Sequence, residues 1–158
     1  MTAKTGIGQD SHTFEEALGK PLILAGIKID HPMGLKGNSD ADVVLHSITN
    51  AVSSITGNNI LGSVADQLCQ EGMTDSSNFL MLALDDLGDW RISHIAIAIE
   101  CLKPKISPQI NSMKKSIAKL CHINKTDVGI TATTGEGLTA FGKGEGIQVI
   151  TIVTIIKT

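Results

Sequence analysis

The sequence predicts an α+β protein, in which a mixed β-sheet carries helices on one of its faces. Segments of strand and helix type follow one another as strands, two helices, a strand, a helix and two strands. We find no repeat, linker or low-complexity segment, so residues 1–158 are expected to form a single domain with a sizeable core. The very apolar final strands predict that the second sheet face is covered too, and a further copy of the chain could cover it.

The strands are predicted from short apolar or alternating segments. Residues 5–11 (TGIGQDS) predict the first, and residues 21–29 (PLILAGIKI) predict one or two more. Residues 92–102 (ISHIAIAIECL) are apolar at nearly every position, so both faces of that strand should be covered. Residues 127–134 and 146–156 predict the last two strands, joined by a glycine-rich segment.

The first helix is predicted over residues 38–57, with Ser39 or Asp40 as its N-cap and Gly57 at its end. Its buried stripe has helical spacing and comprises Val44, Ile48, Val52 and Ile55. Residues 58–75 are expected to be irregular.

Two further helices have recognisable starts. The second spans residues 75–88, with Asp75 or Ser76 as cap. The third spans residues 107–122, with Ser107 as cap and Pro108 at the first helical position. Its core face is predicted to consist of Ile110, Met113, Ile117 and Leu120.

Composition excludes several classes of protein. Apolar residues make up 42% of the chain and charged residues 18%, which argues against disorder. A net charge of −3, one Trp, three Phe and no Tyr argue against a nucleic-acid partner. The longest apolar run, VITIVTII, is too short to span a membrane. The odd cysteine count (Cys69, Cys101, Cys121) predicts a reducing compartment, the cytoplasm or a plastid stroma after removal of a transit peptide.

Asp10 and His12 are two residues apart in the first predicted strand, so their side chains point to the same face. His46 lies four residues after Asp42 on the first helix, at the edge of the apolar stripe. A set of two histidines and one carboxylate suits Zn²⁺ with an open fourth position, or Mn²⁺ or Fe²⁺. The alternative is that each is an ordinary surface or capping residue.

Three segments that contain glycine or lysine resemble anion-binding sites. Residues 132–137 (ATTGEG) offer two hydroxyls and a carboxylate to phosphates and a hard cation, or form an ordinary turn. Residues 102–108 (LKPKISP) carry two lysines before the third helix. These lysines are either solvated surface residues or neutralise phosphates at the N-terminus of that helix. Residues 137–144 (GLTAFGKG) imitate a Walker A loop but lack its Ser or Thr and precede a strand. Without a nucleophile elbow, paired cysteines or a dinucleotide fingerprint, the sequence suits chemistry that needs no protein nucleophile.

Five motifs in order carry a resemblance to a known family: GIGQDSH, NSDADVVLH, KPKISPQI, ITATTGEGL and GKGEGI. From about Gly6 to the C-terminus the chain resembles the 2-C-methyl-D-erythritol 2,4-cyclodiphosphate synthases of the non-mevalonate isoprenoid pathway. The resemblance implies a homotrimer, with active sites between subunits and the remaining sheet faces toward the trimer axis. It implies a phosphorus–oxygen lyase that converts 4-diphosphocytidyl-2-C-methyl-D-erythritol 2-phosphate to 2-C-methyl-D-erythritol 2,4-cyclodiphosphate and CMP. The alternative is a non-catalytic metal- and nucleotide-binding module on the same scaffold.

The same resemblance implies roles for individual residues. Asp10, His12 and His46 match the ligands of one Zn²⁺ per chain, and Glu136 matches a ligand of Mg²⁺ or Mn²⁺ between the substrate phosphates. Asn38, Thr134 and Glu136 match catalytic positions. The matched substrate contacts are Asp10, His12, Asn38, Ser39, Leu61, Gly62, Asp66, Cys101, Pro104, Lys105, Ile106, Ala132, Thr133, Thr134 and Lys143.

Three positions and one acidic segment depart from the family pattern. Asn38 stands where many members have His, and Ile60 replaces an Asp that contacts substrate hydroxyls. Asp66 is what remains of an acidic run. Lys143 replaces an Arg that holds an anion, such as a prenyl diphosphate, in the central trimer cavity.

Overall fold

The computed structural model describes residues 1–157 and contains a four-stranded sheet in the order β1-β6-β4-β5. The strands are β1 (Thr2–Thr13), β4 (Arg91–Glu100), β5 (Val128–Thr133) and β6 (Gly146–Lys157). Strand β6 is antiparallel to both β1 and β4, whereas β4 and β5 run parallel. The mixed sheet and its strands are therefore as predicted from the sequence.

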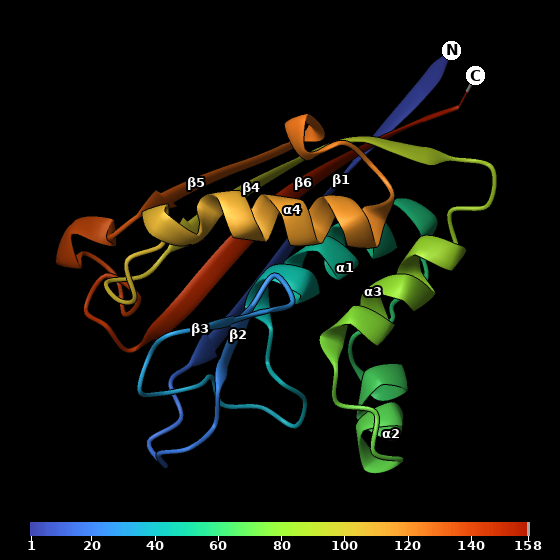
Figure 1. Cartoon of the computed structure of the whole chain (residues 1–158). Coiled ribbons are helices and arrows are strands. Elements are labelled where there is room, and N and C mark those ends of the chain that lie inside the picture. The colour runs from blue at the N-terminus through green and yellow to red at the C-terminus, as the bar shows by residue number, and fades with distance from the viewer. Residues whose placement is uncertain (158) are drawn as a thin grey trace.

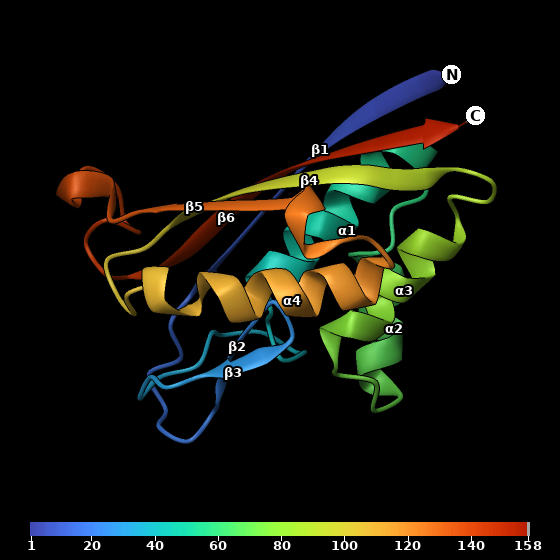
Figure 2. The same cartoon turned by 45° about the horizontal axis from the view of Figure 1, so that its top comes forward.

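The helices lie on one face of this sheet, as Figures 1 and 2 show. Helix α1 (Val43–Thr56) packs on β1 and β6, α3 (Ser76–Asp85) packs on α1, and α4 (Ile110–Cys121) packs on β5. The short strands β2 (Leu22–Leu24) and β3 (Ile27–Ile29) form a hairpin next to α1 and α4. The predicted α+β architecture is confirmed.

The N-cap predicted for the first helix is wrong. Helix α1 begins at Val43, and its N-cap is Asp42, whose side chain accepts from the backbone of Val44 and Leu45. Ser39 and Asp40 instead stabilise the preceding turn, because their side-chain oxygens accept from the backbone N–H groups of residues 41 and 42. Ala41 has a φ of 55°, so the helix cannot extend back through it. Gly57 ends the helix in the left-handed region, as predicted.

Residues 58–75 are not irregular throughout, because they contain helix α2 (Ser63–Gln70). The sequence signal was weak for two reasons. Gly62 provides no side-chain cap, and Ala65 is the buried residue of this short helix. Its inner face is short, because only Leu68 and Cys69 accompany Ala65 against the core, and both are partly buried.

The start of the third helix also differs from the prediction. Ser107 does not cap it; residues Ser107–Gln109 form a 3₁₀ turn without a side-chain cap, and α4 follows from Ile110. Met113 and Ile117 are fully buried, whereas Ile110 and Leu120 are partly buried at the edge of the core. The second helix, α3, begins after Asp75 as predicted.

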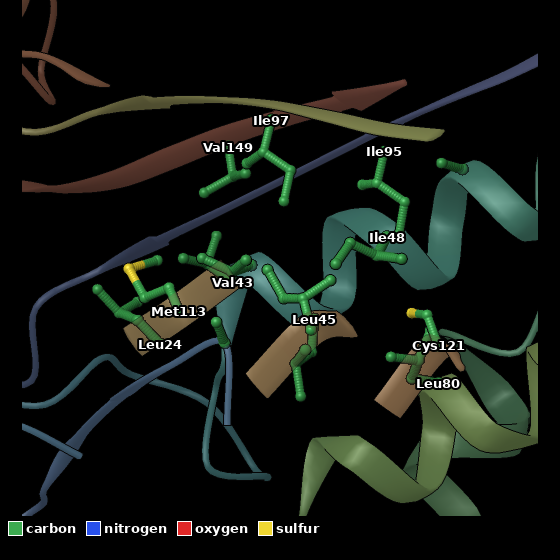
Figure 3. Packing of buried hydrophobic residues seen from close by; sticks show 14 of the residues in the cluster. Leu24, Val43, Leu45, Ile48, Leu80, Ile95, Ile97, Met113, Cys121 and Val149 are labelled. Atoms are coloured by element: carbon green, nitrogen blue, oxygen red, sulfur yellow. The ribbon is translucent and has the colours of Figure 1, made fainter. Parts of the chain in front are cut away.

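The core fills the space between the sheet and the helices (Figure 3). Ile95, Ile97 and Val149 of the sheet point toward Leu45 and Ile48 of α1. Met113 and Cys121 of α4 and Leu80 of α3 complete the same cluster. Burial of this apolar surface is the dominant stabilising contribution to folding.

The opposite sheet face is open in the single chain, so the expectation that both faces of residues 92–102 are covered is not met within it. Burial alternates along β4, and Ala98 on the open face is exposed. Ile7, Ile150 and Ile152 are 62%, 39% and 44% exposed on this face. The register places Ile7, Ile152 and Ala96 in one row across the three strands. The open face therefore carries an apolar patch.

Within residues 1–157, each helix is too short or too polar to cross a membrane.

Candidate metal centre and substrate pocket

Two glycines in β1 allow α1 to lie directly on the strand. A Cβ at Gly6 or Gly8 would come within 2.2 or 2.1 Å of a backbone carbonyl oxygen of α1. Alternate residues of a strand share a face, so Asp10 and His12 point to the same side as these glycines. The GIGQDSH segment therefore brings the helix onto the strand and leaves the acid and the histidine beside it.

His46 of α1 reaches the same point from the helix. Its Nδ1 lies 3.1 Å from Asp10 Oδ2, and His12 Nε2 lies 3.0 Å from the same oxygen. The two imidazole centroids are 5.7 Å apart, and the three potential ligand atoms lie within 4.8 Å of one another. The structure thus brings together the three residues predicted as a metal site.

A contact to the main chain orients the His12 ring. His12 Nδ1 lies 2.8 Å from the carbonyl oxygen of Lys36. Because a carbonyl can only accept, Nδ1 carries the proton and Nε2 presents its lone pair. His12 Nε2 is buried and, among the described residues, has no hydrogen bond of acceptable geometry. A buried nitrogen lone pair beside a carboxylate is suited to a cation.

The three residues also perturb one another electrostatically. Burial raises the pKa of Asp10, but the interactions of its carboxylate with His12 and His46 outweigh this effect and leave the pKa below its ordinary 3.8. The Asp10 carboxylate, 3.0 Å from His12 Nε2, raises the pKa of His12 above 6.5, against the opposing effect of burial. The cluster therefore favours an ionised Asp10 beside a protonated histidine, and a bound cation would take the place of that proton.

The donor set fits a divalent cation. Two imidazole nitrogens and one carboxylate oxygen converge, and His12 Nε2 has no other partner within the described chain. Three protein ligands with a free position are typical of catalytic zinc sites, and the same donors accept Mn²⁺ or Fe²⁺. The residues establish a candidate metal centre without selecting the metal.

The triad opens into a pocket of about 370 Å³. Asn38 and Ser39 line one wall, and Leu61, Gly62 and Asp66 around the start of α2 line the other, so these predicted contacts gather at the triad. The first wall is held in place by Lys20, whose Nζ donates to the carbonyls of residues 37 and 39 at 3.0 Å each. The pocket can therefore present polar groups to an anionic ligand beside the metal.

Sequence reasoning missed several residues of this pocket. Those added by the structure are Lys36, Gly37, Asn50, Ala65, Cys69 and Phe79. Ala65 and Cys69 belong to α2, which the sequence did not reveal. Asn50 lies four residues after His46 on α1, so helical spacing could have indicated it.

Two departures from the family pattern have structural counterparts here. Ile60 is 8% exposed and belongs to the hydrophobic core. A side chain at position 60 therefore packs inward and offers no polar group to a ligand. Asn38 is exposed and lines the pocket, so its amide remains available for hydrogen bonding.

A second group of predicted residues gathers where β4 and β5 end. The backbone N–H of Cys101 donates to the Thr133 carbonyl at 3.1 Å, which joins the segment after β4 to the last residue of β5. The Cys101 thiol donates to the carbonyl of Pro104 at 3.5 Å, and Ile106 is buried beside it. Residues 101–106 and 132–137 therefore form one structural unit.

The polar side chains of this second group are exposed. Thr133 and Thr134 accept from the backbone N–H groups of Gly135 and Glu136, which shapes the turn. Glu136 has a φ of 52° and is exposed. Its carboxylate has no hydrogen-bond partner among the described residues. Lys143 lies in the next turn and is also exposed; β6 follows this turn, which excludes a Walker A arrangement as predicted.

The two groups lie at opposite edges of the sheet, because β1 and β5 are its two edge strands. Asp10 pairs with Val149, which pairs with Ile99, which pairs with Ala132. Three strand spacings, about 14 Å, therefore separate Asp10 from Ala132. Within one chain, the metal triad and the second group do not form a single site.

Comparison with known proteins identifies relatives of the whole chain. The YgbB family model matches residues 3–156. A protein from Chlamydia felis called 2-C-methyl-D-erythritol 2,4-cyclodiphosphate synthase is 47% identical over 157 residues, covering 98% of this chain and 89% of its own length. A Chlamydia abortus protein of the same name is 48% identical with the same coverage.

Solved structures show the same fold. A 2C-methyl-D-erythritol-2,4-cyclodiphosphate synthase in a CDP-bound form has a TM-score of 0.83 and 28% identity, over 97% of this chain and 100% of that one. The bifunctional IspDF from Campylobacter jejuni has a TM-score of 0.84 and 31% identity; the match covers 99% of this chain but 43% of that longer protein. With both sequence and fold in agreement over nearly its full length, the chain belongs to the YgbB family, the family of the 2-C-methyl-D-erythritol 2,4-cyclodiphosphate synthases.

Proposed function

We propose that this protein converts 4-diphosphocytidyl-2-C-methyl-D-erythritol 2-phosphate to 2-C-methyl-D-erythritol 2,4-cyclodiphosphate and CMP, and so acts as a phosphorus–oxygen lyase in non-mevalonate isoprenoid biosynthesis. The observation that carries the proposal is the convergence of Asp10, His12 and His46 at the pocket bordered by Asn38 and Ser39. The names of the curated relatives support the same reaction.

The reaction needs no protein nucleophile. An oxygen of the substrate's own 2-phosphate forms a bond to the β-phosphorus, and the bond from that phosphorus to the bridging oxygen breaks. CMP leaves with the bonding electron pair, and both phosphates remain in the cyclic product. The protein must fold the substrate into a ring-closing pose and reduce repulsion between its phosphates.

Asp10, His12 and His46 are the residues that would hold a Zn²⁺ ion. When bound, such an ion supplies a Lewis acid that withdraws charge from a phosphate oxygen. The chain itself fixes the ligand positions through the β1–α1 contact at Gly6 and Gly8. Asn38 and Ser39 line the same pocket, and in this proposal they donate hydrogen bonds to a phosphate beside the triad.

The second group of residues suits the other phosphates and the base. Glu136 offers a carboxylate to Mg²⁺ or Mn²⁺, both of which prefer oxygen ligands. The Thr133 and Thr134 hydroxyls can contact phosphate oxygens. Residues 101–106 present backbone groups and a buried Ile106, which suits a cytosine read through hydrogen bonds rather than charge. The CDP-bound relative supports a CDP-linked ligand.

A homotrimer would bring the two groups together. They lie about three strand spacings apart within one chain, so a site containing both requires residues of two chains. The open sheet face with Ile7, Ile150 and Ile152 offers an apolar surface for the threefold association. In that assembly Lys143 is the cation proposed to hold an anion, such as a prenyl diphosphate, in the central cavity. Its ammonium group is a point charge, unlike the bidentate fork of Arg.

Turnover of the CDP-linked substrate tests the function directly. ³¹P NMR should show the two coupled phosphorus signals of the cyclic product appearing together with CMP, when Zn²⁺ and Mg²⁺ are supplied. CMP binding without turnover under these conditions would favour the non-catalytic metal- and nucleotide-binding module instead.

A cytoplasmic location accords with the three cysteines, which are all free thiols.

A further inference from the structure

A chain of hydrogen bonds runs away from the metal triad through two residues that the proposed reaction does not use. His46 Nε2 lies 2.8 Å from Ser76 Oγ, and the Ser76 hydroxyl donates a short hydrogen bond to Asp40 Oδ1. Ser76 is fully buried at the first residue of α3, and its backbone N–H also donates to Asp40 Oδ2 at 3.1 Å. Three segments of the chain therefore meet behind His46.

The direction of this chain follows from the chemistry of its members. A carboxylate can only accept, so the single Ser76 hydroxyl proton is given to Asp40. The Ser76 oxygen must then accept from His46, which requires a proton on Nε2. A neutral imidazole carries one proton, so with that proton on Nε2 the Nδ1 atom, 3.1 Å from Asp10 Oδ2, presents its lone pair to a cation shared with Asp10 and His12.

The geometry points to Ser76 and Asp40 as positioning residues that select the metal-binding tautomer of His46 and fix the plane of its ring. This inference rests on the proposed metal site and extends it to residues outside the pocket's ligand set. Outer hydrogen bonds of this kind fix ring orientation and raise ligand basicity. His12 differs from His46, because the main-chain carbonyl of Lys36 selects its tautomer. A side-chain substitution therefore cannot remove that hydrogen bond.

Asp40 also ties this relay to the pocket wall. Its Oδ1 accepts from the backbone N–H of Asp42 at 3.0 Å, and its own backbone N–H donates to the Thr74 carbonyl at 2.9 Å. Asp40 directly follows Ser39, which lines the pocket. The Asp40 carboxylate therefore stabilises the segment that contains Ser39, and through Ser76 it also orients the His46 ring.

The matched pair Ser76→Ala and Ser77→Ala tests the relay. Both remove a hydroxyl at the start of α3, but Ser77 Oγ donates to Asp75 and not to His46. Zinc affinity, measured with zinc alone in competition with a chromophoric chelator, should fall about 10- to 100-fold in Ser76→Ala and stay unchanged in Ser77→Ala. Equal affinities of Ser76→Ala and wild type would overturn the relay while leaving the metal site intact. A wild-type protein that binds no zinc would overturn the metal site as well.

A spectroscopic measurement on the wild type does not depend on the variant folding. In zinc-loaded protein with ¹⁵N-labelled histidine, the His46 proton should reside on Nε2 and exchange slowly with water, because it is buried against Ser76. In Ser76→Ala the same proton should exchange rapidly, whereas in Ser77→Ala it should not. A His46 proton on Nδ1 with zinc on Nε2 would contradict the proposed direction of the hydrogen bonds.

Discussion

The carboxylate of Asp42, at the start of α1, accepts a 2.6 Å hydrogen bond from the backbone N–H of Gly26 in the β2–β3 turn. Its other oxygen accepts from the backbone N–H groups of Ala25, Val44 and Leu45 at 2.9–3.1 Å. Asp42 is fully buried. One side chain therefore caps the helix that carries His46 and fixes the hairpin packed against it.

Replacing Asp42 with Ala should destabilise the protein strongly. The change leaves four backbone donors without their acceptor, three of which face buried surroundings, and we expect a loss of about 3–5 kcal/mol in the free energy of unfolding. Urea denaturation measures it. Asp75→Ala is the matched control, because Asp75 is an exposed N-cap of α3 and its removal should cost about 1 kcal/mol. Similar losses in the two variants would contradict the double role of Asp42.

Stability should also depend on pH through Asp42. Burial raises its pKa from the ordinary 3.8 to about 6, although backbone donors oppose this rise. The folded state thus holds the proton more tightly than the unfolded state, so the contribution is complete below about pH 4 and is lost as pH rises to about 6. We expect this contribution to fall by about 3 kcal/mol across that window.

Urea denaturation of metal-free protein at several pH values would measure the effect. Asp42→Asn cannot titrate, and other groups are unchanged, so the difference between its pH profile and that of the wild type isolates Asp42. Parallel profiles between pH about 4 and 6 would show that Asp42 is not responsible.

His46→Ala should lose bound zinc and catalytic turnover together while the fold is retained. Two remaining ligands hold a divalent ion far more weakly than three. Metal analysis after dialysis and far-UV circular dichroism would check both parts. His122→Asn serves as control, because His122 is an exposed residue with a φ of 55° that Asn tolerates. A full zinc complement in His46→Ala would return His46 to the role of an ordinary helix histidine.

Glu136→Gln should separate the two proposed cations. The amide cannot replace the carboxylate charge, so turnover should fall on the order of 10²-fold or more and lose its dependence on Mg²⁺. Zinc content should be unchanged, because Glu136 lies outside the triad. Glu16→Gln, an exposed substitution, is the control and should retain normal turnover. Loss of zinc from Glu136→Gln would mean that the two sites are not independent.

The open sheet face should mediate trimer formation. Light scattering of the wild type should give three times the 16.6 kDa chain mass. Ile152→Lys places a charge in the apolar row on that face and should shift the protein toward monomer. Met81→Lys on α3 is the control, because Met81 is 50% exposed on the helical side of the molecule. A wild-type monomer at micromolar concentration would refute the shared site.

Much of the fold could be predicted because its signals are local. The apolar segments of β4 and β6 and the stripe of α1 were recognised from period and composition. Helix α2 was missed because it is short, its apolar face is only partly buried beyond Ala65, and Gly62 provides no cap. The sequence predicted Ser39 or Asp40 as the cap of α1, whereas the structure has Asp42. The positive φ of Ala41, a product of the surrounding turn, prevents the helix from starting earlier.

By itself the sequence determined that Asp10 and His12 share a face, since that relation depends only on the alternation of side chains along a strand. It could not determine that His46 meets them, because this requires α1 to approach β1 over Gly6 and Gly8. Tertiary structure alone decided that Ser76 lies behind His46 and that Ala132 lies three strands from Asp10. These relations join segments distant in the chain, and they are fixed by packing and sheet register, which no local period encodes.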